Sequence, residues 1–191
     1  MFTKFNAATD VSKVTLLKKS IAKKVSNDLV ENFPLLEEVV EELVPKKAEL
    51  EGVRLPDNVE LLAVDKEIRF FRWSERDAET GEIDHYPYVP TMRILLKYPN
   101  ILPRFQMDAG AIKFVLKNQS DVMAPGLTNE QAHMDEVDEN TPVALFAHGK
   151  EHPFGIGLTI MSSAEIKEKN AGVAVKLLHV LNDGLWKMKG I

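Results

Sequence analysis

The strongest hydrophobic periodicity in the chain lies near its N-terminus, where an apolar residue recurs at every fourth position. The recurring residues are Leu17, Ile21, Val25, Leu29 and Phe33. This spacing predicts an amphipathic helix. A second helix is predicted to begin at Pro34, which a first helical turn tolerates, and to end at Pro45. Its predicted apolar face comprises Leu35, Leu36, Val39, Val40 and Leu43.

From Glu51 the helical spacing gives way to short runs of apolar and β-branched residues, which are typical of strands. We predict strands over residues 53–55, 59–64 and 68–73. Residues 74–85 are polar and charged without periodicity, which predicts an exposed loop. Thr91 is expected to cap a short helix that runs to Lys97.

A second helical pattern follows Asp108, whose carboxylate is expected to cap the helix at its positive end. The predicted apolar stripe consists of Ala111, Phe114 and Val115, widened by Ile112 and Leu116. Lys113 and Lys117 are four residues apart and share the polar side. Asn118 is expected to end the helix in the left-handed region. Residues 121–124 are predicted to form a short strand that leads into a turn at Pro125 and Gly126.

The rest of the chain predicts further strands around one more small helix. Residues 129–140 are acidic and turn-rich, and strands are predicted over residues 143–148, 154–161 and 173–181. Ser162 and Glu165 have the spacing of a capping box that begins a helix, which Gly172 is expected to end. Many short strands with two small helices favour a partly closed barrel. We therefore predict an α+β protein with a domain boundary at Leu102-Pro103, giving domains over residues 1–101 and 102–191.

Composition narrows the possible functions. The chain of 191 residues has a net charge of −5, and neither predicted domain is basic overall. Any nucleic-acid contact must therefore come from local lysine clusters with a small footprint. The chain has no cysteine, which excludes disulfides, thiolate nucleophiles and cysteine-based zinc sites. No apolar run is long enough to cross a bilayer, and the N-terminus lacks the apolar segment of a signal peptide.

No catalytic set, metal site or cofactor motif is predicted. His148 and His152 are four residues apart, but Gly149 and Pro153 place them in a turn, where that spacing does not pair side chains. Gly155 and Gly157 fit a strand that packs closely against other backbone better than a dinucleotide fingerprint. The paired carboxylates within residues 135–139 are expected to be solvated.

The stretch Asp108-x-Gly110-Ala111-Ile112-Lys113-Phe114-Val115-Leu116, followed by Val122-Met123-x-Pro125-Gly126-Leu127-Thr128, resembles the start of a PUA domain, an RNA-binding module. The segments Leu95-Leu96-Lys97-Tyr98-Pro99 and Asn182-Asp183-Gly184-Leu185-Trp186 extend the resemblance to the malignant T-cell-amplified sequence family. The resemblance implies a pre-PUA domain followed by a PUA pseudo-barrel. It also implies a non-enzymatic, cytoplasmic translation factor that acts on the small ribosomal subunit in re-initiation, recycling and initiator tRNA placement.

The resemblance further implies partners and contact residues. The partners would be small-subunit rRNA or initiator tRNA and a density-regulated-protein-like protein, with the chain a monomer or a heterodimer. The implied RNA-binding residues are Gly110, Ala111, Lys113, Lys117, Asn118, Gln119, Ser120, Val122, Met123, Pro125 and Gly126. The lysines beside the first helix are expected to form a solvated face, with a ribosome or partner contact as the alternative; they are Lys18, Lys19, Lys23 and Lys24.

The chain departs from the resembled family at two places. Asn118-Gln119-Ser120 stands where relatives carry a Gly-Ala pair, which leaves less room for an RNA backbone. Residues 74–85 are longer than in relatives, so we expect them to be mobile and dispensable for folding. Phe114 is expected in the core, whereas core packing and base stacking are both open for Trp186. Two other functions stay open: a protein-interaction adaptor that lacks RNA binding, and an accessory subunit of an RNA-modification enzyme.

Overall fold

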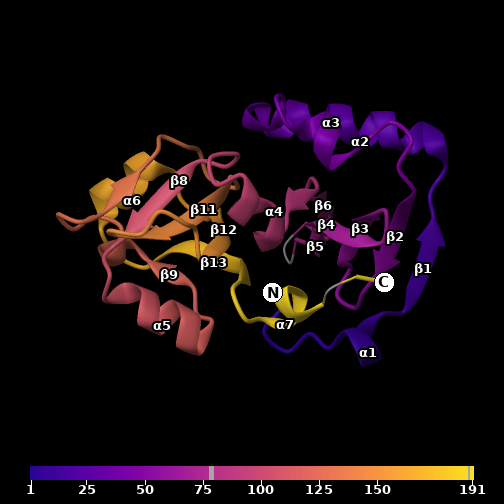
Figure 1. The fold of residues 1–191 in the computed structure, drawn as a ribbon. Helices are drawn as coiled ribbons and strands as arrows, with labels where there is room; N and C mark the ends of the chain where they lie inside the picture. The colour runs from indigo at the N-terminus through magenta and orange to yellow at the C-terminus, as the bar shows by residue number, and fades with distance from the viewer. Residues whose placement is uncertain (78–79, 189) are drawn as a thin grey trace.

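The computed structural model describes residues 1–77, 80–188 and 190–191, which fold around two large sheets and carry a smaller two-stranded one (Figure 1). Helices α2 (Lys19–Asn32) and α3 (Val40–Leu43) lie above the sheet of the first unit, while the second sheet lies at the other end of the molecule. Both helices and strands are present throughout, and the predicted α+β class is confirmed. The domain boundary at residues 101–102 stays a prediction.

The first unit carries an antiparallel sheet in the order β1-β2-β3-β4-β7. Its strands are β1 (Lys13–Leu16), β2 (Leu50–Arg54), β3 (Glu60–Val64), β4 (Glu67–Arg72) and β7 (Val89–Pro90). Its helices are α1 (Ala7–Asp10), α2 (Lys19–Asn32), the 3₁₀ turn η1 (Pro34–Leu36), α3 (Val40–Leu43) and α4 (Met92–Lys97). The three predicted strands between residues 53 and 73 are thus confirmed, with shifted ends.

The first predicted helix is confirmed as α2, which buries Val25 and Leu29. The second is wrong as a continuous helix. The chain instead forms η1 and then, after a turn, the four-residue helix α3. The amides of Glu37 and Val39 donate to carbonyls three residues earlier, which tightens the chain and turns Leu35 outward.

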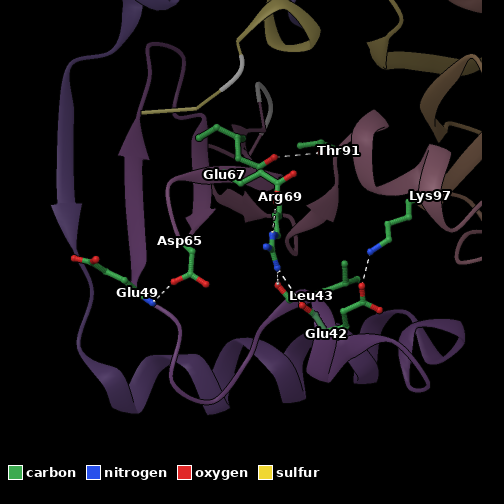
Figure 2. A network of polar contacts seen from close by, with 9 residues as sticks. Glu42, Leu43, Glu49, Asp65, Glu67, Arg69, Thr91 and Lys97 are labelled. Carbon is green, nitrogen blue, oxygen red and sulfur yellow. Dashed lines mark hydrogen bonds and ion pairs between the residues drawn. The ribbon is translucent and has the colours of Figure 1, made fainter.

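Arg69 of β4 fastens the short helix α3 to the sheet (Figure 2). Its Nη1 donates to the carbonyls of Glu42 and Leu43 at 3.1 and 2.8 Å, and its Nε lies 3.0 Å from Glu67 Oε2. These two carbonyls at the end of α3 would otherwise lack partners, so the guanidinium replaces the missing helical turn. Lys97 of α4 contacts the Glu42 carboxylate, which ties a second helix to the same corner.

The polar segment at residues 74–85 is a hairpin, so the predicted loop is wrong. Strand β5 (Ser74–Arg76) pairs antiparallel with β6 (Ile83–His85), and Trp73 stacks on Tyr86 at the base of the hairpin, with ring centroids 4.4 Å apart. Lys176 Nζ of the second unit lies 2.6 Å from Glu75 Oε1. Residues 78–79 lie outside the described residues, and the mobility of the segment stays a prediction.

The second unit is a six-stranded sheet in the order β10-β8-β11-β12-β13-β9. Its strands are β8 (Arg104–Met107), β9 (Val122–Met123), β10 (His133–Met134), β11 (Pro142–Ala147), β12 (Gly155–Thr159) and β13 (Val173–Val180). Its helices are α5 (Ala111–Asn118), η2 (Ala124–Gly126), α6 (Ser163–Lys169) and α7 (Gly184–Lys187). The capping box of Ser162 and Glu165 is confirmed, although α6 ends before Gly172, at a left-handed Asn170.

Strand β11 is buried on both faces and joins the two units. Val143 and Leu145 point into the core of the second unit, whereas Ala144 and Phe146 belong to the core of the first. Because successive side chains of a strand point to opposite faces, one strand serves both cores. Gly157 of the neighbouring β12 is required here, since an added Cβ would lie 2.2 Å from Val175.

The chain end closes the seam between the units from the other side. The Asp183 carboxylate contacts Nδ1 of the buried His179 at 2.7 Å and accepts the amides of Val180 and Trp186, each at 2.9 Å. It thereby holds the turn between β13 and α7, and Gly184 then donates to the carbonyl of Phe2 at 3.0 Å. The Phe2 ring packs edge-on against His179, with centroids 5.7 Å apart.

A single methyl group at the seam is expected to destabilise the protein. In Gly184→Ala the new Cβ would lie 2.0 Å from the Phe5 carbonyl oxygen, so backbone has to move. We expect a loss of about 1–3 kcal/mol in the free energy of unfolding, measured by urea denaturation. Gly126→Ala is the control, because its Cβ would make an ordinary 3.9 Å contact with Ala111. Equal stability of the two variants would contradict the close approach.

The ion pair between Lys97 and Glu42, drawn in Figure 2, is expected to shift the pKa of both side chains. The hydrogen bond from Lys97 lowers the pKa of Glu42 below its usual 4.5, and the same bond raises the pKa of Lys97 to about 12. The pair therefore stabilises the fold above pH 4.5, and this contribution is lost as pH falls through the lowered value. In Lys97→Met, NMR titration is expected to show the pKa of Glu42 moving up toward 4.5.

Lys46→Met is the matched control for that titration. Lys46 Nζ lies 2.8 Å from Glu41 Oε1 and lowers the pKa of Glu41 in the same way. This variant is expected to raise the pKa of Glu41 toward its usual value and to leave the pKa of Glu42 unchanged. A pKa of Glu42 that does not respond to loss of Lys97 would show that the ion pair is absent in solution.

Candidate nucleic-acid interface

Asp108 is not the N-cap that the sequence predicts: Gly110 is the N-cap of α5, which begins at Ala111, and the Asp108 carboxylate lies just ahead of the helix. Its Oδ1 accepts the amides of Gly110 and Ala111 at 2.8 and 3.0 Å, and Asn129 donates to its Oδ2 at 3.2 Å. Gly110 is needed for this geometry, since an added Cβ would lie 2.9 Å from Asp108 Oδ1. The carboxylate thus fixes both the start of α5 and the loop that follows η2.

The predicted apolar face of α5 is partly wrong. Val115 is buried, with Ala111, Ile112 and Leu116 packed around it, whereas Phe114 is 68% exposed. Residues 111, 112, 115 and 116 form one stripe of a helix, and Phe114 lies on the opposite stripe. The sequence analysis missed Phe114 as a surface residue. Its exposure could have been predicted from its helical spacing to Gly110 and Lys117, which places it on the same side of the helix as the lysines.

The outward stripe of α5 therefore combines one aromatic ring with two amines. Lys113 and Lys117 are exposed and flank Phe114, and neither forms an ion pair with any residue that the structure describes. In Figure 1, α5 lies on the outer side of the second unit, away from the first unit's sheet. A flat ring beside free amines can stack on an unpaired base while the amines contact neighbouring phosphates.

The loop after α5 differs from the expectation at one residue. Asn118 stays helical, and Gln119 is the left-handed residue, with φ of 48°. Its side-chain oxygen is buried, and no residue within the described ranges donates a hydrogen bond to it. Ser120 is half-buried and Asn118 is exposed. Gln119 therefore occupies a backbone conformation that glycine adopts at lower cost.

The segment behind α5 presents only part of the predicted contact set. Strand β9 pairs with β13 at the edge of the sheet; it buries Val122 and leaves Met123 49% exposed. Pro125 and Gly126 form the 3₁₀ turn η2, as the turn signal predicts. The Val122 side chain cannot reach a ligand, so Met123 is the accessible member of the pair.

The lysines of the first unit form a separate surface. Lys18, Lys19, Lys23 and Lys24 are exposed along α2 and its start. Lys19 and Lys23 line a groove of about 820 Å³ between α2 and α3, which Glu37 and Glu41 border on the other side. Because α2 and α5 lie at opposite ends of the molecule (Figure 1), the two sets of amines do not merge into one patch.

The remaining candidate groups form no assembled site. His148 Nδ1 lies 3.3 Å from Gln106 Nε2, while His152 is exposed in the turn after β11. Outside residues 78–79 and 189, no three His, Asp or Glu residues cluster so as to hold a metal ion. Trp186 packs in the seam, with the Arg93 guanidinium 4.8 Å from its ring centroid. This contact favours packing over base stacking for Trp186.

Comparison with known proteins identifies the family. A Pre-PUA-like domain matches residues 5–99, and a PUA domain matches residues 103–181. Malignant T-cell-amplified sequence 1 of Danio rerio is 40% identical over 189 residues, covering 99% of this chain and 98% of that protein. The homolog from Drosophila melanogaster is 40% identical over the full length of both chains. The chain belongs to the malignant T-cell-amplified sequence family.

A further relative matches over nearly the whole chain, and solved structures share the fold. Translation machinery-associated protein 20 of Eremothecium gossypii is 39% identical, covering 97% of each chain. A hypothetical protein from Pyrococcus horikoshii has a TM-score of 0.69 and 27% identity, covering 92% of this chain and 98% of its own. A PUA domain protein from Thermoplasma acidophilum shares the fold, with a TM-score of 0.60 at 16% identity. Within the described part of this family member, no helix is long and apolar enough to cross a membrane.

Glycine at the αL position is expected to stabilise the protein. Gln119→Gly removes the cost of positive φ and the buried oxygen without a partner. We expect a gain of about 1 kcal/mol in the free energy of unfolding, measured by urea denaturation. Asn118→Gly is the control and is expected to destabilise by about 1 kcal/mol, because Asn118 is helical. The opposite order would place the αL residue at Asn118.

Proposed function

We propose that this protein is a non-enzymatic, RNA-binding translation factor of the cytoplasm. In this proposal it acts on the small ribosomal subunit in re-initiation, recycling and initiator tRNA placement, together with a density-regulated-protein-like partner. The observation that carries the RNA role is the outward stripe of α5, where Lys113, Phe114 and Lys117 stand exposed together. Family membership and the name of the Eremothecium gossypii relative, translation machinery-associated protein 20, support the link to the translation machinery.

The chemistry of the stripe fits a single-stranded RNA segment. Lys113 and Lys117 supply phosphate contacts, and Phe114 supplies a stacking surface that tolerates any base. Met123 extends the apolar surface beyond the helix. The left-handed Gln119 and its neighbours Asn118 and Ser120 leave polar groups at the end of the stripe. Contacts made through this loop and through η2 belong to the proposal as well.

The charge balance limits how such an interface works. With a net charge of −5, the protein gains nothing from long-range attraction to RNA, so binding rests on the local amines and the ring. Two phosphate contacts on a single strand give a slope of about −1.4 in log affinity against log salt. A shallow salt dependence together with a sizeable stacking contribution is therefore the signature of this interface.

Filter binding to initiator tRNA and to a small-subunit rRNA fragment, each at two salt concentrations, tests the proposal. Phe114→Ala is expected to weaken binding by about 1–3 kcal/mol, or roughly fivefold to a hundredfold, through loss of stacking. Lys113→Glu is expected to abolish binding at the higher salt concentration while the fold stays intact. Negligible affinity of the unaltered protein at both salt concentrations would remove the RNA role.

Lys150→Glu is the matched control for these variants. Lys150 is also exposed on the second unit but lies in the turn after β11, away from α5 in the sequence. The substitution changes the net charge by the same amount as Lys113→Glu. If both variants weakened binding equally, the effect would reflect total charge and the stripe on α5 would have no special role.

One second function has an observation in its favour. The acidic net charge and the absence of glycine in the loop at Gln119 favour a protein-interaction adaptor whose PUA surface does not bind RNA. In that case the exposed Phe114 would dock a protein, and tRNA and rRNA would both fail to bind in the experiment above. An accessory role in RNA modification has no comparable support in this chain.

A further inference from the structure

Strand β1 is an open edge of the first sheet. It ends the strand order, and only β2 pairs with it among the residues that the structure describes. All four of its residues are exposed. Figure 1 shows β1 on the outer side of the molecule, with no element beyond it. Edge strands with free backbone groups are ready templates for another strand, and proteins normally cover or disrupt them.

The register shows which backbone groups of β1 are free. Leu17 donates its amide to the Leu50 carbonyl at 2.8 Å. The backbone amides and carbonyls of Thr15 and Lys13, which are two and four residues earlier, therefore also face β2. Hydrogen-bonded and non-hydrogen-bonded pairs alternate along an antiparallel ladder. Val14 and Leu16 are therefore the residues whose amides and carbonyls point away from β2. Two donors and two acceptors line the open edge at regular spacing.

The side chains of β1 divide the edge into an apolar and a basic face. Val14 and Leu16 lie on one face and are 45% and 62% exposed. On the other face, Lys13 stands directly opposite Arg54 of β2. Like charges directly opposite each other on a sheet destabilise it unless an anion lies between them. Neither cation forms an ion pair with another residue in the described ranges.

A basic hollow lies at the C-terminal end of β1. It has a volume of about 270 Å³; Leu16, Leu17 and Leu50 supply apolar walls. Its charged residues are Lys18, Lys19, Lys47 and one acid, Glu49. Helix α2 also begins here without an acidic residue in its first turn, which adds to the positive potential. The positive charge therefore continues from the edge strand into the hollow.

We propose that β1 docks an extended, acidic segment of a partner protein, which adds a strand to the first sheet. The main chain of that segment pairs with Val14 and Leu16, as in other strand-addition complexes. Its apolar side chains cover the Val14 and Leu16 face, and its alternate carboxylates meet Lys13 and Arg54. A further carboxylate reaches Lys18, Lys19 or Lys47 in the hollow. A second copy of this chain fits poorly, because two such edges would bring their lysines together.

The inference rests on the part of the proposed function that gives this chain a protein partner, and it does not depend on RNA binding. Its probe is a short, capped peptide of alternating glutamate and valine, added to the ¹⁵N-labelled protein. The expected result is saturable shift changes along β1 and slower amide exchange at Val14 and Leu16. A peptide in which lysine replaces glutamate is expected not to bind. Absence of shift changes at millimolar glutamate peptide would overturn the proposal.

Val14→Pro separates strand addition from general attraction. The substitution removes an amide that points outward and spares the ladder to β2, so the sheet is expected to survive. We expect the glutamate peptide to bind about tenfold more weakly or not at all. Unchanged peptide affinity in a folded Val14→Pro variant would overturn the proposed pairing. Should that variant unfold, a glutamate peptide with N-methylated backbone amides provides the same test on the unaltered protein, since it keeps the carboxylates and cannot donate to the strand edge.

The remaining controls distinguish loss of peptide binding at β1 from loss of RNA binding at α5. Lys13→Glu is expected to weaken peptide binding, whereas Lys150→Glu on the second unit is expected to leave it unchanged. Val14→Pro is expected to keep the tRNA affinity of the unaltered protein, so loss of RNA binding and loss of peptide binding remain distinguishable. If amide exchange at Val14 and Leu16 slowed with increasing protein concentration in the absence of peptide, the edge would pair between copies of the chain. That result would overturn the proposal.

Discussion

The arrangement of the molecule depends on one buried carboxylate. Asp183 holds the turn after β13 through His179 and two backbone amides, and this turn sends the chain end back against the first unit. Both side chains of the pair are 1% exposed, and a polar contact in so buried a place is hard to replace. On the other side of the seam, β11 contributes alternate residues to both cores. The two units are thereby held as one body.

The two surfaces of the protein lie on different units, which the contacts across the seam connect. The outward stripe of α5 lies at one end of the molecule, and β1 with its basic hollow lies at the other. Both surfaces carry amines, but their chemistry differs. A ring between two lysines suits an unpaired base with its phosphates, whereas an open strand edge suits a peptide backbone. In the proposed function, binding of RNA at one end and of a protein at the other would position the partner relative to the RNA.

The sequence predicted those elements whose local pattern allows one solution. Helix α2 repeats an apolar residue every four positions, and the capping box of Ser162 and Glu165 is local by nature. Phe114 was assigned to the wrong face because two stripes of α5 have helical spacing. The choice between them is made by the strands beneath the helix, with Val115 at the centre of the buried stripe.

Other features depend on contacts between distant residues. The hairpin at residues 74–85 is supported by the stack of Trp73 on Tyr86 and by Glu75, which contacts Lys176 about a hundred positions away. The early end of α3 is supported by Arg69, a residue of a distant strand, which takes up the last carbonyls of that helix (Figure 2). The open edge at β1 has no signal in the sequence, because it is defined by the strand order.

Residual dipolar couplings of backbone amides in a weakly aligned sample test the rigid relationship of the two surfaces most directly. If the Asp183 turn and β11 hold the units together, couplings from the strands of both sheets fit a single alignment tensor. Two different tensors, one for each sheet, would show that the units reorient independently. That result would contradict the account of a rigid body with two fixed binding surfaces.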